Sequence, residues 1–549
     1  MSFLTGTTYN AEEKIWSGPK YKQIYSPKMT VGEAIVLQLR KTPKKVIQIL
    51  ESTGESLTAE DFLDHSMSLA KTLLDMGLTA GDIVGGYAKH SLHLGTIMLA
   101  SFLCGIPVHG VFQSFEKETI ASIYDTTRPK LIFCDEENYE NALYALESRK
   151  LDAKIVLMTG DIPGVLNIKD LVKKRSDIPD LSEFPCAKLC SADTAAILSS
   201  SGTTGTPKGI LCSHEAMLHN YLYLTVNSDS VMMCFSSMYW STGILNFVQS
   251  LLFSALRIVP DRPYTPDYFF DMVERYKITH CYATPSQIID WVTNHNKDRV
   301  RKALRSIDTL FSGGTNIPQS IQDQIIELLS DNKKCPGFAM GYGTSEIFIA
   351  ATVNGGYPFK YKPQTEGQLW PNREICIVGE NGERLGPNEK GEIYVHSTHT
   401  WLGYYKNPNA TAQAKDGKWT RTGDLGYIDD EGYLHLMGRT KEIIKWLSFQ
   451  ISPQAVEEVL QRLPGVGHVC VFGVPDVASI NLVACGIVRS QDEAGEKLTV
   501  DMVHEYIKKE MDGLYLLRGG VYFLDSLPRT DTGKVQRMKM LQVIEEIDR

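Results

Sequence analysis

The sequence predicts an α/β fold in which helices pack on mainly parallel sheets. Apolar runs at residues 46–50, 131–133 and 155–158 have the length of buried strands. Helical patterns lie between such runs. The clearest begins at Thr58, where Asp61 follows three residues later as in a capping box. Strands that alternate with helices along a chain favour parallel sheets covered by helices.

Two features indicate more than one domain. The chain has 549 residues, beyond the size at which one hydrophobic core usually stops growing. The pattern also changes late in the chain, where residues 425–437 predict a hairpin and Ser452 with Pro453 predicts the start of a helix. We place the boundary between these two segments, at Gly438, a residue type that suits a position with a large change of backbone angles. The predicted domains are residues 1–437 and 438–549.

Composition places the chain among soluble globular enzymes. Apolar residues make up 43% and charged residues 22%, and the net charge of −9 offers no basic surface for nucleic acid. The 11 cysteines are scattered without a C-x-x-C pair, which is typical of reduced thiols in a cytosolic compartment. Residues 1–25 lack the apolar core of a secretory signal, the window 94–108 is too short to span a bilayer, and no Ser-Lys-Leu type signal ends the chain. We therefore expect a cytoplasmic protein without a transmembrane segment.

The most informative segment is the run of hydroxyl and glycine residues before Lys208. Small hydroxylated residues and glycines can wrap a polyphosphate with N–H and O–H donors, and a lysine adds positive charge. A Walker A loop needs glycine directly before the lysine and Ser or Thr after it. Here Pro207 precedes and Gly209 follows, which excludes the kinase and P-loop ATPase classes. The predicted phosphate-binding residues are Ser200, Ser201, Gly202, Thr203, Thr204, Gly205, Thr206, Pro207 and Lys208.

Four further motifs follow this loop, at residues 341–346, 422–424, 438–445 and 528–534. Together with the loop they resemble the signature motifs of the adenylate-forming enzymes: acyl-CoA synthetases, 4-coumarate–CoA ligases, beetle luciferases and peptide-synthetase adenylation domains. The chain looks most like insect luciferase-like acyl-CoA synthetases. This resemblance implies a large N-terminal part and a small C-terminal α+β lid domain on a hinge. It also implies ATP, Mg²⁺, coenzyme A and a small carboxylic acid as ligands.

The resemblance assigns roles to individual residues. Glu346 matches the glutamate that helps to hold Mg²⁺, Asp424 matches the acceptor of hydrogen bonds from the ribose, and Arg439 assists there. Lys534 matches the lysine that reaches the α-phosphate and the substrate carboxylate, and Lys208 belongs to the cradle of the outer phosphates. The other nucleotide-binding residues that the resemblance implies are Gly313, Gly314, Gly341, Tyr342, Gly343, Thr344 and Ser345.

The acyl pocket is expected around the aromatic gate of the family. Trp240 stands where luciferases and coumarate ligases carry histidine. Thr242, Phe247 and Phe348 belong to neighbouring segments that would line the pocket. These segments carry no charge, so an apolar acyl chain fits them better than a charged amino acid. We therefore expect an acyl-CoA synthetase for a medium- or long-chain fatty acid or an aryl-alkenoic acid.

A third catalytic lysine, Lys445, matches the residue that enters the site for thioester formation after the lid rotates. Beyond it the chain departs from the family, because Leu447 and Ser448 stand where relatives usually carry lysine and glycine. A side chain at Ser448 would crowd the pantetheine of coenzyme A. Three alternatives therefore stay open: a luciferase-like adenylate monooxygenase, an adenylating enzyme that loads a carrier protein, and an inactive ligand-binding relative.

Overall fold

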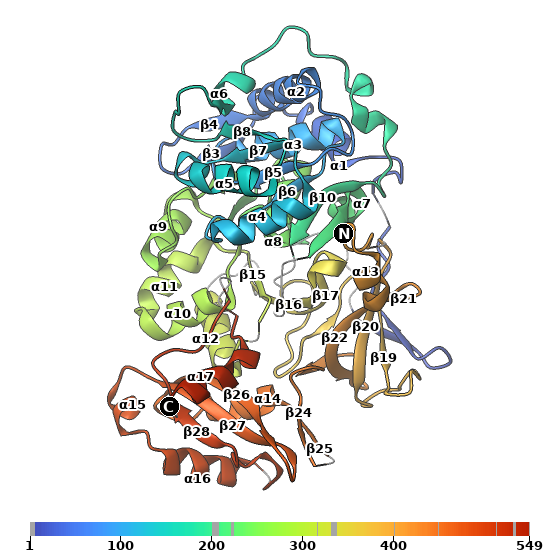
Figure 1. Cartoon of the computed structure of the whole chain (residues 1–549). Coiled ribbons are helices and arrows are strands. Elements are labelled where there is room, and N and C mark those ends of the chain that lie inside the picture. The colour runs from blue at the N-terminus through green and yellow to red at the C-terminus, as the bar shows by residue number, and fades with distance from the viewer. Residues whose placement is uncertain are drawn as a thin grey trace.

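The computed structural model describes residues 6–22, 24–199, 208–220, 224–315, 317–330, 337–399, 401–447, 449–511, 513–530 and 534–547. The strands in these ranges form four sheets. Figure 1 shows the fourth sheet and its helices, in orange and red, below the rest of the molecule. Parallel sheets with connecting helices and a small C-terminal unit confirm the predicted fold class.

The first sheet has the strand order β11-β10-β6-β5-β7-β8-β9. Its neighbouring strands are parallel except β10 and β11, which run antiparallel on either side of the predicted phosphate loop. Helices α3, α4 and α5 make the crossovers that parallel strands require. The strands are β5 (Val84–Tyr87), β6 (Val108–Gly110), β7 (Leu131–Cys134), β8 (Lys154–Leu157), β9 (Leu166–Asn167), β10 (Thr194–Ser199) and β11 (Gly209–Ser213), and the helices are α3 (Leu94–Cys104), α4 (Lys117–Thr127) and α5 (Tyr139–Arg149).

The second sheet has the order β18-β17-β16-β15-β14-β12-β13-β3-β4, and its pairs from β16 to β3 are parallel. Its strands are β3 (Val46–Leu50), β4 (Ser56–Thr58), β12 (Val231–Cys234), β13 (Leu256–Val259), β14 (His280–Tyr282), β15 (Thr309–Gly313), β16 (Phe338–Gly343), β17 (Ala350–Gly355) and β18 (Gln368–Leu369). The helices that connect its strands include α8 (Ser241–Leu252), α9 (Pro266–Tyr276), α10 (Pro285–Asn294), α11 (Lys297–Ala303) and α12 (Gln319–Leu329). Helix α2 (Ala59–Asp75) follows β4 and leads to β5 of the first sheet.

Local sequence signals locate two of these elements. Strand β3 coincides with the predicted run 46–50. Helix α2 begins directly after Thr58, whose hydroxyl accepts the Asp61 N–H while the Asp61 carboxylate accepts the Thr58 N–H. Both halves of the predicted capping box are therefore present.

The third sheet is antiparallel, with the order β1-β2-β19-β20-β22-β21 and β23 paired to β22. Strands β22 and β23 form the predicted hairpin, with Ile428 opposite Leu434 and Gly432 in its turn at φ +81°. The strands are β1 (Thr8–Asn10), β2 (Ile15–Ser17), β19 (Arg373–Val378), β20 (Gly391–Ser397), β21 (Lys415–Asp416), β22 (Trp419–Ile428) and β23 (Leu434–Arg439).

The fourth sheet, with its helices, forms the C-terminal unit and has a hydrophobic core of its own. The chain enters it between Arg439, the last residue of β23, and Ile444, the first of β24. Gly438 lies one residue before the end of β23, at φ +123°. Ser452 caps α14 with Pro453 in its first turn, as the sequence predicts. The elements are β24 (Ile444–Trp446), β25 (Phe449–Ile451), β26 (Val466–Asp476), β27 (Ile480–Arg489), β28 (Gly520–Phe523), α14 (Pro453–Leu460), α15 (Glu493–Lys497), α16 (Val500–Glu510) and α17 (Met540–Ile547).

The remaining α-helices are short: α1 (Val31–Leu39), α6 (Ile168–Leu171), α7 (His214–His219) and α13 (Pro408–Ala414). In the described part of the chain, no helix combines the length and the hydrophobicity needed to cross a bilayer.

Candidate functional site

Asp424 is a buried carboxylate that is held from two sides. Arg439 Nε lies 2.8 Å from its Oδ1, and the Tyr342 hydroxyl donates a hydrogen bond of 2.7 Å to its Oδ2. Burial raises the pKa of Asp424, whereas the Arg439 charge and the Tyr342 hydrogen bond lower it. The sequence-predicted residues Tyr342, Asp424 and Arg439 therefore meet in one place, although they come from two different sheets.

The predicted glycines lie at the carboxyl ends of β15 and β16. A Cβ on Gly313 would lie 2.5 Å from the Gly341 carbonyl oxygen, and one on Gly343 would lie 2.2 Å from the Ile349 carbonyl oxygen. Gly314 follows at φ +98°, a conformation that favours glycine. Packing between strands thus requires Gly313 and Gly343. The carboxyl ends of parallel strands are also where ligands bind in open α/β sheets.

Glu346 lies in the turn η5 (Ser345–Ile347), which directly follows this strand end. Its Oε1 accepts a hydrogen bond of 2.8 Å from the Tyr404 hydroxyl. Just before it, the buried Thr344 hydroxyl has no hydrogen-bond partner among the described residues, and Ser345 is half-buried. Phe348 follows at φ +69°, a strained angle for a bulky side chain of the kind that gathers at functional sites.

Ser200 to Pro207 of the predicted phosphate loop fall outside the described residues, and Ser199 and Lys208 flank them. At one end, the Ser199 hydroxyl lies 3.0 Å from Nε2 of the buried His109. At the other end, Lys208 Nζ lies 5.0 Å from the centroid of the Tyr404 ring, a cation–π distance. Tyr404, which the sequence analysis missed, thus contacts both Lys208 and Glu346.

Lys534 reaches this site from the C-terminal unit. It is half-buried, and the Thr530 N–H donates to its carbonyl oxygen at 2.8 Å. Burial and the Arg439 charge lower the pKa of Lys534, while Asp424 and Glu346 raise it. Lys445, by contrast, is exposed on β24. Lys534 therefore senses the charges of the site.

Arg537 is a second residue that the sequence analysis missed. Its Nε lies 3.1 Å from Glu442 Oε2, and its Nη1 contacts Glu457 and the Val471 carbonyl oxygen. Its side chain is 12% exposed, so these charges meet away from bulk solvent. Arg537 therefore links the segment that begins at Lys534 to α14 and to the segment just after Arg439.

The residues predicted for the acyl pocket fall into two groups. Trp240 and Thr242 are half-buried at the start of α8, and the Trp240 ring packs edge-on against Tyr239 at 4.6 Å and Phe112 at 6.3 Å between centroids. Phe247 is fully buried in the core, with its ring centroid 5.0 Å from the Arg257 guanidinium. Phe348 is buried as well. Only the first group reaches the surface.

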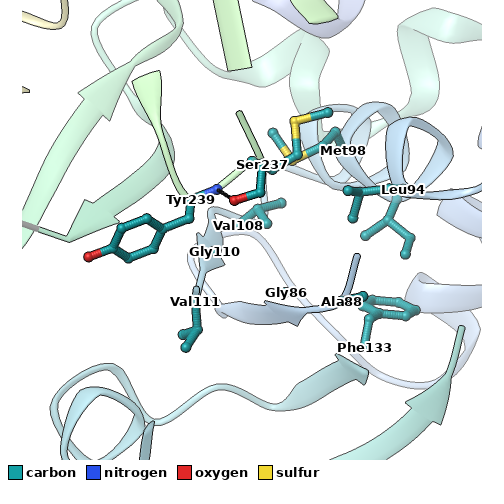
Figure 2. A pocket seen from close by; sticks show the side chains of 12 residues that line it. Gly86, Ala88, Leu94, Met98, Val108, Gly110, Val111, Phe133, Ser237 and Tyr239 are labelled. Atoms are coloured by element: carbon teal, nitrogen blue, oxygen red, sulfur yellow. Dashed lines mark hydrogen bonds between the residues drawn. The ribbon is translucent and has the colours of Figure 1, made fainter. Parts of the chain in front are cut away.

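A small apolar cavity lies next to Tyr239. Figure 2 shows it between Gly86 and Gly110 of the first sheet, Leu94 and Met98 of α3, and the segment of Ser237 and Tyr239. Its volume is about 10 Å³. A single water molecule needs roughly 10–15 Å³, so an acyl chain cannot enter this cavity as it stands.

The site fits Mg²⁺ as a partner of a nucleotide. Among the residues that the structure describes, no group of three His, Cys, Asp or Glu side chains could hold a metal ion. Mg²⁺ is commonly bound by one or two carboxylates together with substrate phosphates, and Glu346 offers one such carboxylate next to Lys208 and Tyr404.

Residues 36–405 match the family described as AMP-binding enzyme, and residues 455–534 match the AMP-binding enzyme C-terminal domain. The chain is 25% identical to luciferin 4-monooxygenase of Photuris pensylvanica over 509 residues, which cover 90% of this chain and 91% of the relative. It is 27% identical to "Probable 4-coumarate--CoA ligase 1" of Dictyostelium discoideum over 548 residues, which cover 95% and 96%. The solved structure of the anthranilate CoA ligase AuaEII in complex with anthranoyl-AMP is similar in fold, with a TM-score of 0.82 at 20% identity over 94% of this chain and 98% of that one.

Proposed function

The chain belongs to the family of AMP-binding enzymes, and from this premise we propose that it is an AMP-forming acid–thiol ligase. The match confirms the adenylate-forming superfamily that the five motifs predicted. In the proposed reaction, ATP converts a carboxylic acid into an acyl-adenylate. Coenzyme A then takes the acyl group and AMP is released.

In the first step the substrate carboxylate attacks the α-phosphorus of ATP. A bond forms between a carboxylate oxygen and phosphorus, the bond to the bridging oxygen of the β-phosphate breaks, and pyrophosphate leaves. No protein nucleophile is needed, because positioning and charge stabilisation supply most of the catalysis. Asp424 would hold the ribose and Lys208 the outer phosphates. Mg²⁺ bound with the nucleotide, beside Glu346, would neutralise part of the phosphate charge.

The observation that supports this assignment most is the position of Lys534. It is carried by the C-terminal unit, yet Arg439, Asp424 and Glu346 are the charges that influence its pKa. A lysine in that place can stabilise the negative charge of the carboxylate and the α-phosphate as they approach each other. The lid orientation of this structure therefore suits adenylate formation.

In the second step the thiol of coenzyme A attacks the carbonyl carbon of the acyl-adenylate. A carbon–sulfur bond forms, the bond to the AMP oxygen breaks, and the thiol proton is lost. Lys445 is exposed while Lys534 is in the site, so the lid must turn if Lys445 is to take part. Gly438, at φ +123° just before the crossing to the fourth sheet, is the proposed hinge.

We propose an acid with an apolar body, either an aryl-alkenoic acid or a medium- or long-chain fatty acid. The uncharged rings of Phe112, Tyr239 and Trp240 gather at the start of α8 and support an apolar partner. The matched 4-coumarate–CoA ligase is named for an aryl-alkenoic acid, which supports that choice further.

The experiment is a substrate panel of coumarate, decanoate, adipate and phenylalanine with ATP and Mg²⁺, assayed for pyrophosphate and, by mass spectrometry, for acyl-CoA. We expect pyrophosphate release with coumarate or decanoate without coenzyme A, and a thioester once it is added. Lys534→Ala serves as the matched control without adenylation. A preference for phenylalanine would overturn the acid class. An adenylate that forms no thioester would favour carrier loading, and one that consumes O₂ would favour a monooxygenase.

A further inference from the structure

A second cavity, of about 50 Å³, is lined by none of the residues predicted to bind nucleotide or acid. It is enclosed by the end of β20, the segment that follows it, the turn between β21 and β22, and Ile347 of η5. Ser397, Trp401, Lys415 and Lys418 line it, and no carboxylate does so in the described part of the chain. The lining is therefore rich in hydrogen-bond donors and poor in negative charge.

One of these donors lacks an acceptor among the described residues, and a second is a cation whose only printed acceptor is neutral. Trp401 is 7% exposed, and its indole Nε1–H has no hydrogen-bond partner among the described residues. The Lys415 ammonium donates to the Trp401 carbonyl oxygen at 2.5 Å and lies 5.3 Å from the indole ring centroid. Burial lowers the pKa of Lys415 with no carboxylate to oppose it. A buried N–H donor and a half-buried ammonium group thus line one cavity without a counter-charge there.

A second cation, the Arg373 guanidinium, forms a hydrogen bond with Ser397 of the cavity lining. Arg373 is 1% exposed and donates from Nε to the Ala350 carbonyl oxygen, from Nη1 to Ser397 Oγ at 2.7 Å, and from Nη2 to Asn220 Oδ1. All three acceptors are neutral. The Ser397 oxygen accepts from Arg373 and from the His399 N–H at 3.2 Å, so its own proton remains available for donation.

Uncompensated buried charge is unfavourable, and an anion between such cations would relieve it. We propose that this cavity binds a small oxyanion of the phosphate type, held by the Lys415 ammonium, the Trp401 indole N–H and the Ser397 hydroxyl. The volume is several times the roughly 10–15 Å³ that one water-sized sphere needs, which leaves room for an ion larger than water. Lys418, whose Nζ lies 2.6 Å from Glu374, stands at the rim with its charge already paired.

Side chains that line the cavity pack against residues of the candidate active site. The Trp401 ring packs edge-on against Tyr404 at 4.9 Å between centroids, and Tyr404 donates to Glu346. Ile347, next to Glu346 in the chain, lines the cavity itself. An oxyanion here would brace the segment that positions Tyr404 and Glu346, but the proposal does not depend on the ligase reaction.

The test uses the full-length protein with ¹⁵N-labelled tryptophan and inorganic phosphate as the probe. The indole N–H signal that disappears in Trp401→Phe belongs to Trp401. We expect phosphate to shift this signal saturably in the wild type and in Lys418→Met, but not in Lys415→Met. Sodium chloride at matched ionic strength should not reproduce the shift. Sulfate should compete with phosphate, since both are tetrahedral. The titration is repeated with the protein saturated with AMP, because phosphate could also occupy the nucleotide site.

Melting temperature gives an independent readout if Lys415→Met folds poorly. Phosphate should raise the melting temperature of the wild type, and this increment should vanish in Trp401→Phe, which keeps a smaller aromatic ring and removes the donor. No phosphate-dependent shift of the Trp401 signal, or the same shift in Lys415→Met or with chloride, would overturn the proposal. A shift that AMP abolishes would assign the phosphate to the nucleotide site instead. Tighter binding of formate than of phosphate would contradict the tetrahedral class.

Discussion

Arg439 and Asp424 are neighbours in both backbone and side chain. They lie opposite each other in the register of β22 and β23, and their side chains form an ion pair of 2.8 Å. Gly438 comes directly before Arg439, and the chain leaves this sheet directly after it. A rotation near this point can therefore move the fourth sheet and Lys534 while the Asp424 carboxylate stays where the second and third sheets hold it.

Tyr342→Phe tests how Asp424 is held. The change removes the 2.7 Å hydrogen bond to Asp424 and little else. A hydrogen bond to a charged group contributes about 1.5–3 kcal/mol, so we expect ATP to bind roughly tenfold more weakly and the protein to lose stability of this order. Calorimetric titration with ATP and chemical denaturation measure the two effects. Tyr427→Phe, whose ring stacks on His435 in the same sheet, is the control and should leave ATP affinity unchanged.

Arg537→Met tests the contacts that hold the segment of Lys534 against α14 and Glu442. The substitution leaves the Glu442 and Glu457 carboxylates without their shared partner. Breaking a buried ion pair from one side costs about 3–5 kcal/mol, so stability should fall markedly. Because Lys534 then loses its support, kcat for adenylation should fall while KM for ATP stays similar. Lys539→Met, at an exposed site two residues away, should change neither. Unchanged kcat in Arg537→Met would remove it as a positioning residue.

Trp240→Leu tests the aromatic cluster at the start of α8. The change removes ring contacts with Phe112 and Tyr239. Aromatic pairs add about 0.5–1.5 kcal/mol beyond area burial, so kcat/KM for an aryl-alkenoic acid should fall by roughly two- to tenfold. KM for ATP should not move. An equal effect on aryl and aliphatic acids would show that the ring has no part in selecting the acid.

The pH dependence of the adenylation rate follows from the lowered pKa of Lys534. Burial and the Arg439 charge lower its pKa from the ordinary 10.5, and the proposed active form is the charged ammonium. The adenylation rate should therefore fall on the alkaline side, at a pH below 10.5. In the same window the folded state binds fewer protons than the unfolded state, so unfolding free energy should rise with pH relative to Lys534→Met. A pH–rate profile and denaturation at several pH values check both signs. A flat alkaline limb up to the ordinary pKa of lysine would contradict the assignment.

The sequence predicts best where the signal is local. The capping box at Thr58 and Asp61, the hairpin within residues 425–437 and the Ser452 cap depend on residues close together in the chain, and all three occur as predicted. Four of the five motifs also bring Tyr342, Asp424, Arg439 and Lys534 into one site, because each of these motifs ends an element or lies next to one.

Contacts between distant residues could not be predicted in this way. The partners Tyr404 and Glu346 are 58 residues apart, and Arg537 and Glu442 are 95 apart. In the sequence, Arg537 looks like any charge near a polar terminus. An apolar stretch likewise does not distinguish a pocket from a core, so Phe247 was assigned to the acyl pocket although its ring lies in the core. Whether it also touches the acid stays a prediction.

The central claim is that two lysines act in turn, Lys534 in adenylation and Lys445 in thioester formation. The most direct measurement compares both half-reactions, with the second started from synthetic acyl-adenylate, in Lys534→Ala and Lys445→Ala. A charge-stabilising donor supplies roughly 3–4 kcal/mol, so Lys534→Ala should slow pyrophosphate release by about 10²–10³ while ATP still binds. Lys445→Ala should leave that step nearly intact and slow thioester formation. Equal losses in both half-reactions for Lys445→Ala, or an unchanged first step in Lys534→Ala, would contradict the account.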